Sequence, residues 1–343
     1  MNSNVLDSTF PNSWFRIATS NELPAKKVIP LRYFGKDFVL FRAENGTPYL
    51  LDAYCPHMGA HLGYTGTVRD ETIRCPYHGW LWNGKGSCVD VPYTNKQPKV
   101  KIKSYPVREV NGLIFMYYHE EGNSPDWEIP ELPELNSNQW TPLRSVKRWK
   151  ARTDLKNYLD NSIDVAHLSQ IHSQTFKTAK TESLEVNGPV LTHKMSQKYN
   201  LSSFAGGKII AEDGSVTTNY YGPGYDVTFY WWTKGIIQLT MLNIFTGTPI
   251  DKDYLDIQVF LSIKKFLPPP LNWIPEAIAK KDVAMIFNQD IPILENKVYL
   301  THPPLYEEDG PIMQARRWAS QFYKVKAGTD WILSPVIEHN NNR

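Results

Sequence analysis

The sequence predicts an α+β protein with an all-β N-terminal domain, followed by a domain that combines an antiparallel sheet with helices. Short apolar runs separated by Gly, Pro and Asn fill the first third of the chain, a pattern typical of small antiparallel domains. Longer strand-like runs and helical segments share the remainder. With 343 residues, of which 41% are hydrophobic, the chain is large enough for two cores.

Strand-forming segments account for the first domain. Residues 28–42 are rich in Val, Ile, Leu, Tyr and Phe, and Gly35 with Lys36 marks a turn inside this run. Residues 48–54 and 113–118 form two further short apolar runs. Because each run is short and ends near a turn-forming residue, we expect neighbouring strands to pair in an antiparallel sheet.

A polar linker containing proline separates the two predicted domains. It covers residues 120–125, and Pro130 and Pro133 follow it. Prolines at this density disfavour both helix and central strand. We therefore expect the first domain over residues 14–124 and the second domain over residues 125–338.

The second domain contains both helical and strand patterns. Residues 156–172 have helical character, and residues 276–287 carry apolar side chains at helical spacing. Residues 227–232, 236–245 and 254–263 are aromatic and β-branched runs, which are typical of strands. This mixture predicts an antiparallel sheet accompanied by helices.

The charge balance excludes several classes of partner. Lys and Arg together number 37 and Asp and Glu together number 35, so we expect neither nucleic acid nor an anionic membrane as a partner. No apolar run approaches the roughly 20 residues of a membrane span, and the polar N-terminus lacks the apolar stretch of a signal peptide. We therefore expect a soluble, cytoplasmic protein.

Two short motifs each bring a cysteine and a histidine together. Cys55 and His57 form a Cys-x-His motif, and Cys75 and His78 form a Cys-x-x-His motif further along the chain. Iron–sulfur clusters require thiolate ligands, and imidazole ligands on one iron raise the reduction potential of such a cluster. The four residues therefore predict a [2Fe–2S] site with two cysteine and two histidine ligands.

A structural zinc site is the alternative for these four side chains, because zinc also binds two cysteines with two histidines. Zinc fingers usually group cysteines on one element and histidines on another, whereas each motif here mixes them. Neighbouring residues have simpler interpretations. We expect His61 to pack against its loop and Cys88 to be a small, half-buried strand residue.

The second candidate site lies in the predicted helix over residues 156–172. Asn161, Asp164 and His167 are spaced by three residues, which places them along one helical face. His172 follows five residues after His167, a separation that turns it about 140° away on a regular helix. Both histidines can bind one ion only if the helix ends or bulges between them. The alternative is an amphipathic helix in which both histidines have ordinary polar partners.

Both motifs resemble those of a known family. Cys55-Pro56-His57-Met58-Gly59-Ala60 with Cys75-Pro76-Tyr77-His78-Gly79-Trp80 resembles the Rieske motif of ring-hydroxylating oxygenases, although the family most often has Arg where this chain has Met58. The second segment is similar to the pattern Asn-x-x-Asp-x-x-His-x-x-x-x-His that follows the Rieske domain in these enzymes. The resemblance implies a Rieske [2Fe–2S] domain followed by a helix-grip (START-like) domain that binds one Fe(II) ion.

A third iron ligand must come from later in the chain. Two histidines and one carboxylate with open positions are the signature of a non-haem Fe(II) site. Asp282, Asp290 and Glu295 are the candidates. Asp282 follows two lysines, as expected of a solvated helix residue. The segment around Asp290 resembles the one that supplies the ligand in the family, so we choose Asp290 over its main rival, Glu295.

The resemblance gives Asp164 a different role from the iron ligands. It implies that the Asp164 carboxylate accepts a hydrogen bond from His167 and, across a subunit boundary, from the cluster ligand His78. A helix salt bridge is the alternative. Asn161 belongs to the same pattern and is grouped with Asp164 as catalytic. Because the bridge joins two subunits, the family resemblance implies a homotrimer.

The function implied by the resemblance is that of a terminal oxygenase. Residues 308–323 resemble the oxygenase component of 3-ketosteroid 9α-hydroxylase. The chain lacks a Gly-x-Gly-x-x-Gly fingerprint, so NAD(P)H must deliver electrons through a separate reductase or ferredoxin. Aromatic strands between residues 220 and 260 suggest a hydrophobic, ring-containing, possibly steroid-like substrate. We expect O2-dependent hydroxylation of this substrate.

Several alternatives remain open from the sequence. Demethylation, desaturation and cis-dihydroxylation use the same kind of iron site as hydroxylation. A Rieske electron carrier with an appended domain would lack the mononuclear iron, and a ligand-binding protein that kept its cluster would not consume oxygen. The iron content per chain separates the oxygenase from the carrier.

Overall fold

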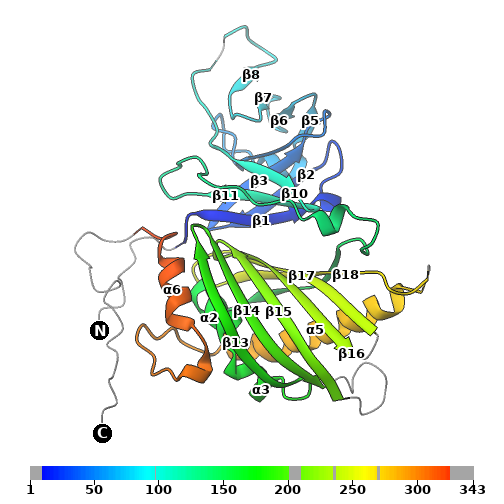
Figure 1. The fold of residues 1–343 in the computed structure, drawn as a ribbon. Helices are drawn as coiled ribbons and strands as arrows, with labels where there is room; N and C mark the ends of the chain where they lie inside the picture. Colours follow the sequence, from blue (N-terminus) through cyan, green and yellow to red (C-terminus); the bar gives the residue numbers. More distant parts are fainter. Residues whose placement is uncertain (1–9, 97, 201–209, 235–236, 269–270, 325–343) are drawn as a thin grey trace.

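The structure is a computed structural model that describes residues 10–96, 98–200, 210–234, 237–268 and 271–324. An all-β domain stands above a second domain in which helices accompany one large antiparallel sheet (Figure 1). This arrangement confirms the predicted α+β class. The predicted end of the second domain, residue 338, lies outside the described residues.

Three small antiparallel sheets build the N-terminal domain. Their strand orders are β1-β11-β10, β2-β3-β4-β9 and β5-β6-β7-β8. The strands are β1 (Ser13–Thr19), β2 (Val28–Tyr33), β3 (Lys36–Arg42), β4 (Pro48–Asp52), β5 (Thr67–Arg69), β6 (Thr72–Arg74), β7 (Leu81–Asn83), β8 (Cys88–Asp90), β9 (Ser104–Tyr105), β10 (Val107–Val110) and β11 (Leu113–Tyr118). The predicted turn at Gly35, whose φ is +70°, separates β2 from β3.

A seven-stranded antiparallel sheet forms the centre of the second domain, with the order β12-β18-β17-β16-β15-β14-β13. The strands are β12 (Arg144–Ala151), β13 (Phe176–Asn187), β14 (Val190–Asn200), β15 (Ile210–Tyr221), β16 (Tyr225–Lys234), β17 (Ile237–Pro249) and β18 (Leu255–Ile263). The three strand-like runs predicted in this region fall on β16, β17 and β18. The first residue of the second run, Ile236, lies outside the described residues.

Helices accompany the sheets of both domains. The α-helices are α1 (Leu62–Thr65), α2 (Leu155–Ile163), α3 (Ala166–Ile171), α5 (Trp273–Leu294) and α6 (Ile312–Ser320), and the short 3-10 helices are η1 (Ser20–Glu22), η2 (Pro133–Asn136) and η3 (Glu307–Asp309). The long helix α5 contacts β12, β18 and α2 and runs along one side of the sheet (Figure 1). Among the described residues, no helix combines the length and apolar character needed to cross a bilayer.

The predicted helix over residues 156–172 is broken in two. Helix α2 ends before Asp164, whose ψ of 121° is extended rather than helical. The amide of the next residue, Val165, leaves the helical pattern and donates to the Asp309 carbonyl at 3.0 Å. The prediction that Asn161 and His167 share one helical face is therefore wrong, because these two residues lie on different helices.

The second predicted helix is longer than its apolar pattern indicated. Residues 276–287 form the middle of α5, which continues to Leu294 and includes Pro292. Proline lacks an amide hydrogen and so removes one helical hydrogen bond. This loss falls close to the C-terminal end of α5, where a single missing bond disturbs few others. The extension places Asp290 inside the helix rather than after it.

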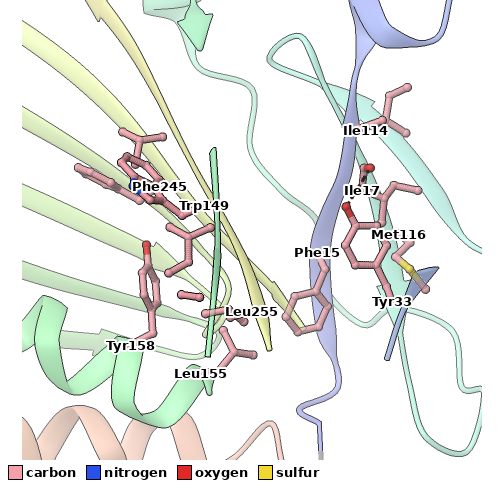
Figure 2. Packing of buried hydrophobic residues seen from close by; sticks show 14 of the residues in the cluster. Phe15, Ile17, Tyr33, Ile114, Met116, Trp149, Leu155, Tyr158, Phe245 and Leu255 are labelled. Carbon is pink, nitrogen blue, oxygen red and sulfur yellow. Dashed lines mark hydrogen bonds between the residues drawn. The ribbon is translucent and has the colours of Figure 1, made fainter. Parts of the chain in front are cut away.

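A shared apolar core joins the two domains. Phe15 on β1 and Met116 on β11 belong to the same buried cluster as Trp149 on β12 and Leu255 on β18 (Figure 2). All four side chains are at most 9% exposed. Burial of apolar surface at about 25 cal/mol per Å² makes this contact a substantial stabilising term. The domains are therefore packed into one body.

A buried ion pair lies in the same interface. Arg16 on β1 is fully buried, and its Nη2 atom lies 2.5 Å from Oδ2 of Asp256 on β18. Arg148 and Tyr33 also donate to the Asp256 carboxylate, at 2.7 Å and 2.8 Å. Because a buried charge is costly unless it is paired and hydrogen-bonded, this carboxylate depends on donors from both domains.

Candidate metal centres

The two Cys/His motifs fold into loops with the same backbone geometry. The Cys55 amide donates to the Ala60 carbonyl at 2.9 Å, and the Cys75 amide donates to the Trp80 carbonyl at 2.8 Å. Both cysteines are buried, with exposures of 1% and 2%. Two equivalent loops therefore present one sulfur each from the same end of the N-terminal domain.

A glycine with positive φ closes each of these loops. Gly59 has φ of +71° and Gly79 has φ of +77°, and their amides donate to the Cys55 and Cys75 carbonyls at 2.8 Å and 3.1 Å. L-amino acids with a side chain rarely adopt this conformation. A Cβ atom at position 79 would also lie 2.9 Å from Nη2 of Arg74, whereas position 59 has open space around it. Backbone conformation, not crowding, thus explains Gly59.

The two histidines of the motifs lie close to each other. The ring centroids of His57 and His78 are 4.6 Å apart, and Trp80 stacks on His57 at 4.5 Å with an interplanar angle of 9°. The Nδ1 atom of His78 is buried without a hydrogen-bond partner. Buried polar atoms nearly always have a partner, so this nitrogen fits a metal ligand.

The buried sulfurs of Cys55 and Cys75 favour binding of a positively charged group. Burial raises the pKa of the Cys55 thiol to about 11, and the neighbouring Cys75 sulfur acts in the same direction. Two thiolates side by side are therefore unfavourable unless a cation holds them. A [2Fe–2S] cluster supplies that charge and accepts thiolate ligands.

His61 and Cys88, which lie near the cluster motifs in the sequence, have structural roles. His61 is the N-cap of α1, where its Nδ1 atom accepts a hydrogen bond from the Gly63 amide at 3.0 Å. Cys88 begins β8 and packs in the core of the N-terminal domain. Met58, in the position that is most often Arg in the Rieske motif, is 62% exposed at the cluster loop.

A second group of side chains meets on the other domain. His167, His172 and Asp290 each offer a ligand atom, and these atoms all lie within 4.8 Å of one another. In the part of the chain that the structure describes, this is the one group of three or more His, Cys, Asp or Glu residues close enough for a single ion.

The break between α2 and α3 and the end of α3 create this convergence. His167 is the second residue of α3, and His172 follows its last helical residue as the C-cap, with φ of −103° and ψ of 29°. The helix therefore ends between the two histidines, which is one of the two solutions that their spacing required. Asp290 comes from α5, and its side chain is 3% exposed.

Hydrogen bonds orient both imidazole rings. Nδ1 of His172 lies 2.8 Å from Oε1 of Gln289, and Nδ1 of His167 lies 2.8 Å from the main-chain oxygen of Asp164. Because these oxygen atoms can only accept, each Nδ1 carries the hydrogen and each Nε2 is left with its lone pair. Metal-binding histidines usually have this second partner.

The remaining nitrogen of His172 faces the carboxylate. Its Nε2 atom lies 2.9 Å from Oδ1 of Asp290, yet neither atom has a hydrogen-bond partner of acceptable geometry. Burial alone would lower the pKa of His172, but Asp290 and Gln289 together raise it above its usual value. Two buried, convergent and unsatisfied ligand atoms fit a cation bound between them.

The other candidate carboxylates lie outside this group. Glu295 caps the C-terminus of α5, and its Oε1 atom accepts a hydrogen bond from the Arg152 amide at 3.2 Å. The lysines before Asp282 led us to expect a solvated side chain, but Asp282 is half-buried. This burial raises the pKa of its carboxyl group. Only Asp290 of the three candidates lies with the two histidines.

The Asp164 side chain contacts the backbone rather than the imidazole of His167. Its Oδ1 atom accepts a hydrogen bond from the His167 amide at 3.1 Å but lies 3.8 Å from the ring Nδ1. Within one chain, the ring contact predicted for this carboxylate is therefore made by the Asp164 carbonyl instead. The carboxylate is 32% exposed and available to a second partner. Asn161 is half-buried in the last turn of α2.

Gln289 was not among the site residues predicted from the sequence. It immediately precedes Asp290 on α5, and its amide oxygen fixes the orientation of the His172 ring. A polar residue beside a candidate ligand on a mostly apolar helix was the signal for it. That signal could not identify its partner, because the contact joins α5 to the end of α3.

Family models match nearly the whole chain. A Rieske [2Fe–2S] domain model matches residues 13–106, and a model of the 3-ketosteroid 9α-hydroxylase C-terminal domain matches residues 116–323, more than half of the chain. The chain belongs to the Rieske non-haem iron oxygenases. The cofactors of this oxygenase component are thus a [2Fe–2S] cluster and a mononuclear iron.

Similar proteins come from both animals and bacteria. This Rieske oxygenase is 31% identical to a cholesterol 7-desaturase of Ciona intestinalis, over 93% of this chain and 70% of that protein. It is also 31% identical to the oxygenase component of a 3-ketosteroid-9-alpha-monooxygenase of Rhodococcus rhodochrous, over 92% of this chain and 83% of that protein. Among solved structures, dicamba monooxygenase bound to dicamba superimposes with a TM-score of 0.76 at 18% identity, over 92% of this chain and 98% of that one. This last likeness supports the fold.

Proposed function

We propose that this Rieske oxygenase hydroxylates a steroid or a similarly rigid, hydrophobic ring compound. The observation that carries the proposal is the convergence of His167, His172 and Asp290 beside a sheet face lined with apolar side chains. The catalytic-domain match to 3-ketosteroid 9α-hydroxylases supports a steroid-like substrate. One oxygen atom of O2 enters the substrate and the other leaves as water. Electrons come from NAD(P)H through a separate reductase or ferredoxin, which favours a cytoplasmic location.

We propose that Cys55, His57, Cys75 and His78 hold the cluster and that His167, His172 and Asp290 hold the iron. When bound, the two groups supply single-electron transfer and oxygen activation. The chain's own residues position them: Gln289 holds the hydrogen on Nδ1 of His172, and the Asp164 carbonyl does so for His167. These contacts leave Nε2 of each ring free to act as the metal ligand.

A homotrimer is the assembly that we propose, because the two sites are far apart within one chain. The cluster loops adjoin β5 to β8 at one end of the molecule, and α3 lies at the opposite end (Figure 1). Exposed apolar side chains surround the cluster loops, including Met58 at 62% and Tyr77 at 61%. Docking of this end on the α2–α3 break of a neighbouring chain would bring His78 to the exposed Asp164 carboxylate. We propose residues 124 and 125 as the boundary between the domains.

Desaturation is the second candidate reaction, because the chain is as similar to the cholesterol 7-desaturase as to the 9α-monooxygenase. The deciding experiment supplies the holoenzyme with a surrogate reductase, NADH and a panel of sterols and 3-ketosteroids, and analyses products by mass spectrometry. We expect a product that has gained one oxygen atom. A product that has lost two hydrogens would establish desaturation instead. Failure to oxidise any steroid in the panel would exclude this substrate class.

The cluster ligands are tested separately by electron paramagnetic resonance. The reduced protein should give a Rieske-type signal, which Cys75→Ser and His78→Ala should abolish. Cys88→Ser is the matched control, because the Cys88 thiol donates a hydrogen bond to the Asp90 carbonyl at 3.4 Å, and this variant should keep the signal. A native protein that is colourless and contains zinc would contradict the assignment.

A further inference from the structure

A row of buried polar side chains crosses the sheet of the catalytic domain. His193 on β14 is directly opposite Thr218 on β15, Thr218 is opposite Thr228 on β16, and Thr228 is opposite Asn243 on β17. Directly opposed residues in antiparallel strands point to the same face. All four side chains are at most 4% exposed. We call these four residues, with Asp226 two positions before Thr228, the polar row.

The polar row lies on the side of the sheet that faces α5. Ile244, next to Asn243, points the other way and packs in the core with Trp14 of the N-terminal domain. Phe245, two positions from Asn243 and therefore on its face, stacks on Phe287 of α5 at 5.4 Å. Since α5 also carries Asp290, the polar row and the proposed iron site belong to the same interior.

Several atoms of the polar row have no hydrogen-bond partner. They are Nδ1 of His193, Oδ1 of Asp226 and Oδ1 of Asn243. Other members are satisfied: Thr218 and Thr228 bond each other at 3.0 Å, and Nε2 of His193 lies 3.0 Å from Oγ1 of Thr181. An unpaired polar atom in an apolar interior is costly. Three of them along one row indicate an absent polar partner.

The electrostatics of the polar row favour a neutral partner. Burial holds the pKa of the Asp226 carboxyl well above its usual range, with only the Thr228 hydrogen bond opposing it. A protonated carboxyl can donate a hydrogen bond, while Oδ1 of Asn243 can accept one. A hydroxyl group both donates and accepts, and therefore complements these two residues together.

Apolar packing connects the polar row to the iron site. Tyr158 on α2 is 6% exposed, and Ile291, which follows Asp290 on α5, packs against the same apolar cluster. Between them the face is apolar, with Phe245 and Met241 in the same cluster as Tyr158.

We propose that Asp226 and Asn243 bind a hydroxyl group at the end of the substrate away from the carbon that is oxidised. The polar row then selects hydroxylated ring compounds, while the apolar face holds the hydrocarbon skeleton. This inference rests on the proposed function, because it places the substrate beside the same iron. A site built to bond a hydroxyl group rejects an analogue that lacks it far more strongly than an apolar site rejects an added group.

The test measures binding to the holoenzyme by equilibrium dialysis. The probes are an androstane with one hydroxyl group, the same skeleton with one ketone, and the unsubstituted hydrocarbon. We expect the wild type to prefer the hydroxyl compound to the hydrocarbon, and Asn243→Leu to reduce this preference by about 10- to 100-fold. Asp226→Asn should retain most of the preference, since its amide still donates, whereas Asp226→Leu should lose it.

Asn219→Leu is the matched control. Asn219 is next to Thr218 on β15, points to the opposite face and bonds Thr192 at 2.9 Å, so the preference should not change. A reduced near-ultraviolet circular dichroism signal or loss of the cluster spectrum identifies a misfolded variant. If Asn243→Leu is misfolded, the comparison of Asp226→Asn with Asp226→Leu tests the inference. An unchanged preference in Asn243→Leu and Asp226→Leu would overturn the inference while leaving the proposed function intact. A wild type that binds none of the three probes would overturn both.

Discussion

Nε2 of His172 lies 2.9 Å from Oδ1 of Asp290, although His172 follows the end of α3 and Asp290 lies near the C-terminal end of α5. Neither atom has another hydrogen-bond partner, which supports the proposal that a metal ion binds between them.

Removal of the carboxylate should empty the mononuclear site alone. We expect Asp290→Ala to lower the iron content by about one third, because the cluster holds two of the three irons, and to abolish oxygenation. The Rieske signal should persist. Elemental analysis with paramagnetic resonance measures both. Glu295→Ala is the control, and a loss of iron there with retention in Asp290→Ala would mean that the carboxylate is wrongly chosen.

Gln289 should affect iron binding through the orientation of His172. Gln289→Leu removes the acceptor of the Nδ1 hydrogen, and loss of such a partner typically lowers metal affinity about 10- to 100-fold. Gln289→Glu keeps an acceptor and should retain most of the affinity. Titration of the apoprotein with Fe(II) under anaerobic conditions gives the two dissociation constants. Equal affinities for Gln289→Leu and the wild type would rule out a positioning role.

Asp164 should matter for electron delivery and not for iron binding. Asp164→Asn keeps an oxygen that can accept the His167 amide hydrogen and leaves the carbonyl contact to the ring unchanged. We therefore expect both metals to stay bound while turnover falls by orders of magnitude. The measurement is a single turnover, in which the cluster is reduced, mixed with oxygen and substrate, and followed as it is re-oxidised. A wild-type re-oxidation rate in Asp164→Asn would exclude the bridging role.

The interface carboxylate should make stability depend on pH. Burial opposes ionisation of Asp256, but Arg16, Arg148 and Tyr33 together hold its pKa below the usual value. A lowered pKa in the folded state means that the stabilisation is complete above the unfolded pKa, about 4, and is lost as the pH falls through the folded value. Asp256→Asn should cost about 3–5 kcal/mol near neutral pH, because Arg16 is left unpaired.

Thermal unfolding of Asp256→Asn and of the wild type between pH 7 and pH 3 tests this expectation. The difference between their melting temperatures should narrow towards the acidic end. Asp37→Asn is the control, since its partner Arg32 is 57% exposed and a pair of this kind contributes about 0–1 kcal/mol. A constant difference across the whole range would show that the charge of Asp256 is not responsible.

Much of the architecture could be predicted because its causes are local. Short apolar runs between turn-forming residues predicted the strands of the first domain, and the turn at Gly35 follows from its positive φ. Residues such as Cys55 and His57 are neighbours in the chain, so their spacing carries the information directly. The comparison with family models confirms the fold and the cofactors that these motifs implied.

What escaped prediction depends on contacts between distant segments. The α2–α3 break involves the Val165 amide bonding the Asp309 carbonyl, a partner far along the chain. The length of α5 exceeds its apolar pattern because tertiary packing, rather than periodicity, decides where a helix continues. The polar row could not be predicted from the sequence for the same reason. Its members come from four strands, and only the register of the sheet aligns them.

The apolar core shared by β1, β11, β12 and β18 has a consequence for how the molecule can be divided. Phe15 and Met116 would become exposed if the N-terminal domain were expressed by itself, and Arg16 would lose Asp256. The Rieske domain of this chain is therefore not an interchangeable module. A fragment that ends near residue 124 should aggregate or stay unfolded, and calorimetry of the intact chain should record both domains melting together.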